Sequence, residues 1–228
     1  MTEAEWYSCT DPERVLRWLN SQGKLGGRKL RLFAVACCRR AWPLLTDERS
    51  RRAVEVAERY ADGQASEEEL TTAGTAAWDA ARERLRQKFE SAEVCGAAAR
   101  TTWLPEADFY GFWQASVFLS EIRRAFAAGQ GDLQCAMLRD LVVNLFGDAP
   151  VISPPWLAWN EGRVPTLAHA LYEERCLPEG TLDSARLAVL ADALEEAGCT
   201  EKPVLSHLRA PGPHVRGCWA VDRLLGKE

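Results

Sequence analysis

Between residues 199 and 218 the chain carries four side chains of the types that bind zinc: Cys199, His207, His214 and Cys218. They follow the pattern Cys-x7-His-x6-His-x3-Cys. A tetrahedral zinc site uses four such nitrogen and sulfur ligands. His214 and Cys218 lie four residues apart, so they share a face if both belong to one helix. We expect a helical hairpin with core cysteines and two polar histidines here, and no cofactor. The alternative is a zinc ion bound by these four side chains.

A second candidate for chemistry is the adjacent pair Cys37 and Cys38. A thiolate nucleophile needs a base and a lowered pKa. Arg39 and Arg40 supply positive charge, but the nearest histidine in sequence is His169. We therefore expect buried, structural thiols here. The eight cysteines of the chain include no Cys-x-x-Cys pair and are expected to be reduced.

A basic segment runs from Lys24 to Arg52, with nine Lys or Arg residues and two acids. Such a segment can contact nucleic-acid phosphates or an acidic partner. The alternative is a solvated face that forms ion pairs with Glu55 and Glu58 or with the acids of Ser66–Glu69. No zinc-finger, RNA-binding or phosphate-loop motif supports nucleic-acid binding. The candidate contacts are Arg28, Arg31, Arg39, Arg49 and Arg52.

Two tryptophans, Trp156 and Trp159, follow Pro154-Pro155. At this spacing they share one side of a helical turn. We expect them to hold two parts of the chain together. The alternative is that they present a groove to a partner peptide.

The elements that position these residues are expected to be helices throughout. Ser66 with Glu69 forms a capping box, and Asp11 followed by Pro12 marks another helix start. An aromatic-rich helix is expected over 105–128. The sequence predicts an all-α fold with an N-terminal helical bundle over 1–147 and a Pro/Trp-rich connection over 148–165. A smaller helical part follows over 166–228, with one continuous domain as the alternative.

Composition places the chain among globular proteins. Of its 228 residues, 47% are hydrophobic and 27% are charged. The net charge of −5 argues against a protein whose whole surface binds nucleic acid. The first residues lack the basic and apolar regions of a secretory signal. The longest apolar run, Leu32–Cys38, is far shorter than a membrane span. We expect a cytoplasmic protein without membrane partners.

Six stretches of the chain carry a resemblance to known proteins: Thr2–Trp6, Arg28–Arg40, Leu45–Gly63, Trp156–Asn160, Leu190–Cys199 and His214–Trp219. In these stretches the chain resembles a family of uncharacterised proteins that are present in many copies in planctomycete-type bacterial genomes. The resemblance implies a bacterial cytoplasmic setting and an architecture, but no activity. Members often carry His-Cys where this chain has His207-Leu208, so one potential ligand is missing here.

The sequence contains no nucleotide loop, catalytic triad or HExxH motif, and only three histidines, so no catalytic residue is predicted. The expected function is that of a non-enzymatic helical module or accessory subunit that binds a protein partner. One alternative is a helical subunit of a nucleoprotein complex that contacts phosphates through the arginines. Another is a zinc-stabilised domain or metalloenzyme.

Overall fold

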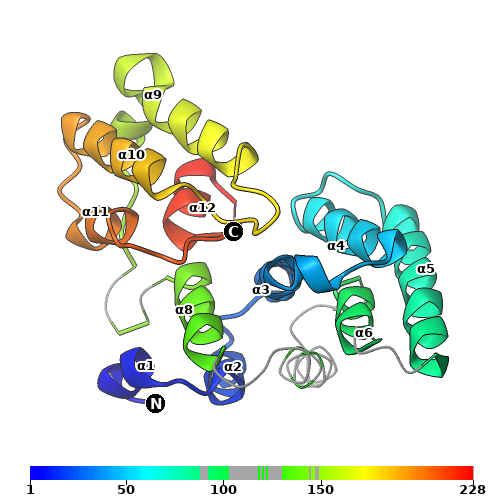
Figure 1. The fold of residues 1–228 in the computed structure, drawn as a ribbon. Coiled ribbons are helices and arrows are strands. Elements are labelled where there is room, and N and C mark those ends of the chain that lie inside the picture. The colour runs from blue at the N-terminus through cyan, green and yellow to red at the C-terminus, as the bar shows by residue number, and fades with distance from the viewer. Residues whose placement is uncertain are drawn as a thin grey trace. The chain divides into compact units, whose positions relative to one another are not determined.

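A computed structural model describes residues 1–87, 92–102, 118, 120, 122, 130–143, 145–146 and 149–227. Within these residues the chain is helical, with two isolated bridges, Cys176 to Thr181 and Thr181 to Val215, as its only β pairing. The predicted all-α fold is confirmed (Figure 1). The helix expected over 105–128 lies almost wholly outside the described residues.

The chain divides into two compact units, Met1–Leu138 and Arg139–Glu228. The sequence predicted a connection over 148–165, but helix formation resumes at Pro154, so much of that segment is helical. Residues 147 and 148, at the predicted boundary, lie outside the described part. No described helix is long and apolar enough to cross a membrane.

The N-terminal unit is built of helices that pack side by side. They are α1 (Glu3–Ser8), α2 (Pro12–Ser21), α3 (Gly27–Arg40), the short 3-10 turn η1 (Trp42–Leu44), α4 (Glu48–Ala61), α5 (Glu67–Arg86), α6 (Ala92–Arg100) and most of α8 (Gly131–Leu141). The helix α5 contacts both α4 and α6 (Figure 1). Small buried residues on α5, such as Ala73 and Ala77, allow this close packing.

The caps predicted at Asp11 and Ser66 are confirmed. Asp11 accepts hydrogen bonds from the backbone at the start of α2, and Asp47 does the same for α4. Ser66 and Glu69 form the expected capping box of α5. Each cap satisfies backbone N–H groups that the first helical turn leaves without a partner.

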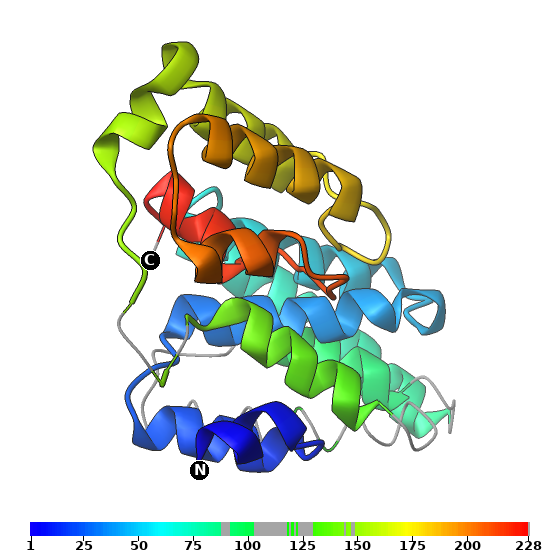
Figure 2. The ribbon, with the colours of Figure 1, turned by 90° about the vertical axis from the view of Figure 1, so that its left-hand side faces the viewer.

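The C-terminal unit contains α9 (Pro154–Glu173), α10 (Ser184–Glu196), α11 (Lys202–Leu208) and α12 (Trp219–Leu225). The helix α10 lies alongside α9 and contacts α11, while α12 packs on α9 (Figure 2). Their apolar faces form one core that includes Tyr172, Leu190 and Trp219. α9 is broken by left-handed backbone at Asn160, Glu161 and Gly162.

Candidate metal centre

Four potential metal ligands meet inside the C-terminal unit: Asp140, His207, His214 and Cys218. One ligand atom from each lies within 4.8 Å of the others. The cluster therefore contains three of the four residues that the sequence predicted, together with an aspartate that it did not.

Each ligand comes from a different element. Asp140 lies in the last turn of α8, and His207 lies in the last turn of α11. His214 belongs to the loop between α11 and α12, and Cys218 is the residue that precedes the first turn of α12. A site built this way joins segments that are far apart in the sequence.

His214 and Cys218 do not share a helix, which corrects the geometry expected from their spacing. The last helix begins only at Trp219, after both residues. Gly217 has a φ of +93°, a left-handed conformation that interrupts a right-handed helix. The loop on the other side of His214 turns at Gly212, which has a φ of +90°.

The donor atoms of the cluster converge on one another. Asp140 Oδ1 lies 2.7 Å from His214 Nδ1 and 3.0 Å from His207 Nε2. The same His207 Nε2 lies 3.2 Å from Cys218 Sγ. A catalytic triad places its acid and its nucleophile on opposite nitrogens of the histidine. Because both groups here face one nitrogen, the arrangement is not that of a triad.

The atoms that face away from the cluster are held by the backbone. Asp140 Oδ2 accepts a hydrogen bond of 2.8 Å from the Val215 N–H. His214 Nε2 lies 3.0 Å from the Ala210 carbonyl, which only accepts, so this nitrogen carries a proton. His214 Nδ1 must then reach the Asp140 carboxylate through a second proton or a cation. A backbone carbonyl on the outer nitrogen is typical of metal-binding histidines.

Burial decides the electrostatics of the site. The side chains of Asp140 and His214 are almost fully buried, while that of His207 is 18% exposed. Burial would raise the pKa of Asp140, but hydrogen bonds from His207 and His214 outweigh it and lower this pKa to about 2. Burial alone would lower the pKa of His214, yet its bond to Asp140 raises it. The site therefore stabilises positive charge beside Asp140.

Cys218 is fully buried, and burial raises the pKa of its thiol well above the ordinary value. A thiol in this state is a poor nucleophile. A bound metal ion reverses this effect, because a coordinating thiol loses its proton. The residue is therefore suited to metal binding and unsuited to nucleophilic attack.

Cys199 lies outside the cluster, which corrects the predicted ligand set. It follows α10, where its N–H donates to the Leu194 carbonyl, and its side chain belongs to the apolar core. Asp140 supplies the fourth potential ligand of the cluster instead. The one local indication that Asp140 is buried is its position between two leucines, Leu138 and Leu141, which are themselves buried.

The five candidate arginines of the basic segment do not all face solvent. Arg31 is 7% exposed, donates to the Thr101 carbonyl at 2.6 Å, and stacks over the Tyr60 ring. Arg39 is 4% exposed and pairs with Glu58. The expectation that Arg31 and Arg39 contact phosphates is therefore wrong, because their guanidinium groups are used inside the unit.

The other three arginines also have partners. Arg28 forms a 2.7 Å ion pair with Asp62. Arg49 pairs with Asp47 and, on α5, with Glu83. Arg52 is the most exposed of the three, and its nitrogen lies 3.9 Å from the Glu69 carboxylate.

The remaining candidates lie in apolar surroundings. Trp156 and Trp159 are partly buried and pack against the core of the C-terminal unit. Their role in joining two parts of the chain stays a prediction. Cys37 and Cys38 are buried, as expected, and burial raises the pKa of the Cys37 thiol. The eight cysteines, all within the described residues, form no disulfide.

Comparison of the chain with family models, with curated proteins and with solved structures found no significant match. The site is therefore interpreted from its own geometry and chemistry.

Proposed function

We propose that the chain is a non-enzymatic helical module whose C-terminal unit is stabilised by one zinc ion. Asp140, His207, His214 and Cys218 are the ligands in this proposal. The observation that carries it is the convergence of their four donor atoms within 4.8 Å. The ion fixes the loop between α11 and α12 against the end of α8.

The donor set supports zinc over other common metals. Calcium and magnesium prefer sites made only of oxygen ligands. One thiolate, two imidazoles and one carboxylate match the borderline character of Zn²⁺ and its tetrahedral geometry. Four protein ligands complete that geometry and leave no position for a substrate. This favours a structural role over a metalloenzyme.

The alternative to a metal is a network of protons, with a protonated His214 paired to Asp140. That network does not need a thiolate, because Asp140 and His214 satisfy each other directly at 2.7 Å. The metal-bound site requires the Cys218 thiolate, whereas the network of protons does not.

The test is a cobalt titration of the metal-free protein, monitored by absorbance. Cobalt(II) reports thiolate ligands through a charge-transfer band and the coordination geometry through its visible spectrum. The native chain should take up one equivalent of cobalt with both signals. Cys218→Ser should lose the charge-transfer band and bind cobalt more weakly.

Cys199→Ser is the matched control, because Cys199 is also a buried cysteine of the C-terminal unit but lies outside the cluster. This variant should retain the native spectrum. No cobalt uptake by the native chain, or equal loss of the thiolate band in both variants, would contradict the proposal. Circular dichroism of each variant checks that it is folded.

A further inference from the structure

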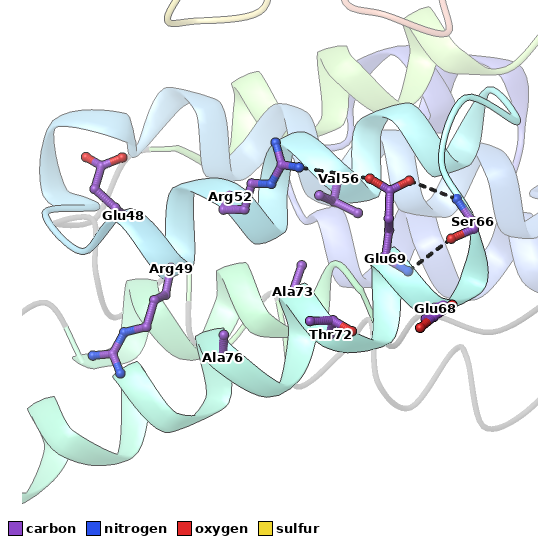
Figure 3. A pocket seen from close by; sticks show the side chains of 10 residues that line it. All are labelled: Glu48, Arg49, Arg52, Val56, Ser66, Glu68, Glu69, Thr72, Ala73 and Ala76. Atoms are coloured by element: carbon purple, nitrogen blue, oxygen red, sulfur yellow. Dashed lines mark hydrogen bonds and ion pairs between the residues drawn. The ribbon is translucent and has the colours of Figure 1, made fainter.

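A hollow between α4 and α5 in the N-terminal unit is lined by side chains of both charges (Figure 3). Its Arg49 pairs with Asp47 and Glu83. Its Arg52 lies 3.9 Å from Glu69. Because both arginines already face carboxylates, the hollow favours no charged ligand. The candidate metal centre differs from it, since one of the four ligands there is not held as the other three are.

His207 is the most exposed of the four proposed ligands. Its side chain is 18% exposed, whereas those of Asp140 and His214 are 2% and 3% exposed. Cys218 is fully buried. His207 also lies in the last turn of α11, a helix of only seven residues. Solvent therefore reaches the centre at His207.

The two histidines are anchored in different ways. The outer nitrogen of His214, Nε2, lies 3.0 Å from the Ala210 carbonyl. His207 directs Nε2 towards the cluster, so its outer nitrogen is Nδ1, and no residue that the structure describes forms a hydrogen bond with it. Metal-binding histidines are normally fixed at the outer nitrogen, and loss of this anchor weakens metal binding by about 10- to 100-fold. His207 is therefore the ligand whose bond is most easily broken.

Aromatic rings hold His207 in place of such a hydrogen bond. The Trp219 ring lies 4.8 Å from the His207 ring, centroid to centroid, and the His214 ring lies 4.9 Å from it, edge to face. Trp219 is the first residue of α12, is 6% exposed and belongs to the core of the C-terminal unit. Its ring is therefore fixed by its own packing, and it limits the rotation of the His207 imidazole.

We propose that the metal ion enters and leaves the centre at His207, and that Trp219 is the positioning residue that keeps this ligand in place. The inference rests on the zinc site of the proposed function. The bond from His207 Nε2 to the ion breaks, the imidazole turns towards solvent, and a donor atom of a small ligand from solution takes the vacated position. Asp140, His214 and Cys218 keep the ion bound meanwhile. The step exchanges one ligand for another and transfers no electron.

Rescue by free imidazole tests where the centre opens. His207→Gly and His214→Gly each remove one imidazole, the first beside solvent and the second in the interior. With cobalt bound to the full chain, added imidazole should return His207→Gly to the native visible spectrum, because it can reach and fill the vacated space. His214→Gly should not respond to imidazole over the same range of concentrations.

The rate of metal release tests the role of Trp219. The zinc-loaded full chain is mixed with an excess of pyridylazoresorcinol, a chelator that changes colour when it binds zinc. Trp219→Leu should release zinc about tenfold faster than the native chain, because the ring contact with His207 is lost. Trp219→Phe keeps an aromatic ring and should stay within about threefold of the native rate.

Leu224→Ala is the matched control for this rate. Leu224 is a buried core residue of the same helix, so its loss also loosens the core, but it belongs neither to the cluster nor to the ring contacts of His207. This variant should release zinc within about threefold of the native rate. Equal acceleration in Trp219→Leu and Leu224→Ala would show that release follows loosening of the whole unit, and it overturns the proposal.

The rescue experiment separates this proposal from the zinc site itself. If imidazole fails to restore His207→Gly, or restores both glycine variants equally, the centre does not open at His207, although the zinc site remains. If the native chain takes up no cobalt, the zinc site and this inference are both overturned. Circular dichroism of each variant checks that it is folded.

Discussion

At the scale of single residues, Asp140 holds the candidate metal centre together. Its carboxylate faces His207 and His214 through one oxygen and the Val215 N–H through the other. A buried carboxylate costs free energy unless it is paired and hydrogen-bonded. Both oxygens of Asp140 have hydrogen-bond partners, and the pKa lowered to about 2 keeps the group charged.

Asp140→Asn should destabilise the metal-free protein by about 3 kcal/mol or more, because it leaves a buried histidine without its counter-charge. Asp192→Asn, in the same unit, removes an exposed partner of Arg209 and should cost no more than about 1 kcal/mol. Chemical denaturation measures both. Equal losses in the two variants would show that Asp140 has no special role.

The buried pair of Arg39 and Glu58 provides a second prediction at this scale. Arg39→Met should destabilise the N-terminal unit by about 3–5 kcal/mol, because Glu58 is then buried without a partner. The double variant with Glu58→Leu should recover most of that loss, since neither charge remains. Urea denaturation of the three proteins checks this. If the loss of unfolding free energy in the double variant equals the sum of the losses in the two single variants, the two residues do not act as a pair.

At the scale of elements, the loop from α11 to α12 decides where two of the ligands point. Gly212 takes a φ of +90°, and a Cβ added there would lie 2.9 Å from the His214 backbone nitrogen. Real Cβ contacts are longer, so the chain on which His214 stands would have to shift. The position of His214 therefore depends on this glycine.

Gly212→Ala should reduce both stability and metal affinity. Gly198→Ala is the matched control, because Gly198 has a φ of +89° but open space around its Cβ position. The control should lose only about 1 kcal/mol through backbone strain and should keep the native affinity. Cobalt titration and thermal denaturation of the two variants separate these effects. Equal metal affinities would show that the loop does not position His214.

Local sequence signals predicted elements well and long-range partners poorly. The caps at Asp11 and Ser66 were predictable because a cap is formed by residues within one turn of each other. The sequence does not reveal that Gly217 is left-handed, so the spacing of His214 and Cys218 could not show that they lie outside one helix. Asp140 was missed because its partners lie 67 and 74 residues further along the chain.

The prediction that Arg31 and Arg39 contact phosphates is wrong for a similar reason. Arg31 and Arg39 look exposed by charge, but their partners, the Thr101 carbonyl and Glu58, come from other helices. Charge alone does not predict exposure when a buried partner is available. The charges of α3 therefore did not reveal that the side chains of Arg31 and Arg39 are buried together with its apolar residues.

At the scale of the whole molecule, the stability of the protein should respond to pH in opposite ways with and without metal. The pKa of His214 is raised above 6.5, so in the metal-free protein its pair with Asp140 contributes fully below pH 6.5. This contribution is lost as the pH rises through the raised pKa. The pKa of Asp140 is lowered, so its contribution is lost only as the pH falls from 3.8 towards about 2.

The affinity for zinc should instead increase with pH, because zinc displaces protons from histidine and cysteine. Above pH 6.5 the metal-free protein should lose stability, while the stabilisation that added zinc provides should grow. Melting temperatures with zinc and with a chelator, measured between about pH 6 and pH 8.5, test this window. A zinc-dependent shift that stays constant or shrinks with rising pH would show that protons and metal do not compete at the site.

The central claim is that one zinc ion belongs to the native protein. The most direct measurement is the zinc content of the native chain, purified without chelator and dialysed against metal-free buffer, by elemental analysis. The account predicts one zinc per chain for the native protein and for Cys199→Ser, and a content near zero for Cys218→Ser. A folded native chain without stoichiometric metal, whose melting temperature is unchanged by added zinc, would contradict it.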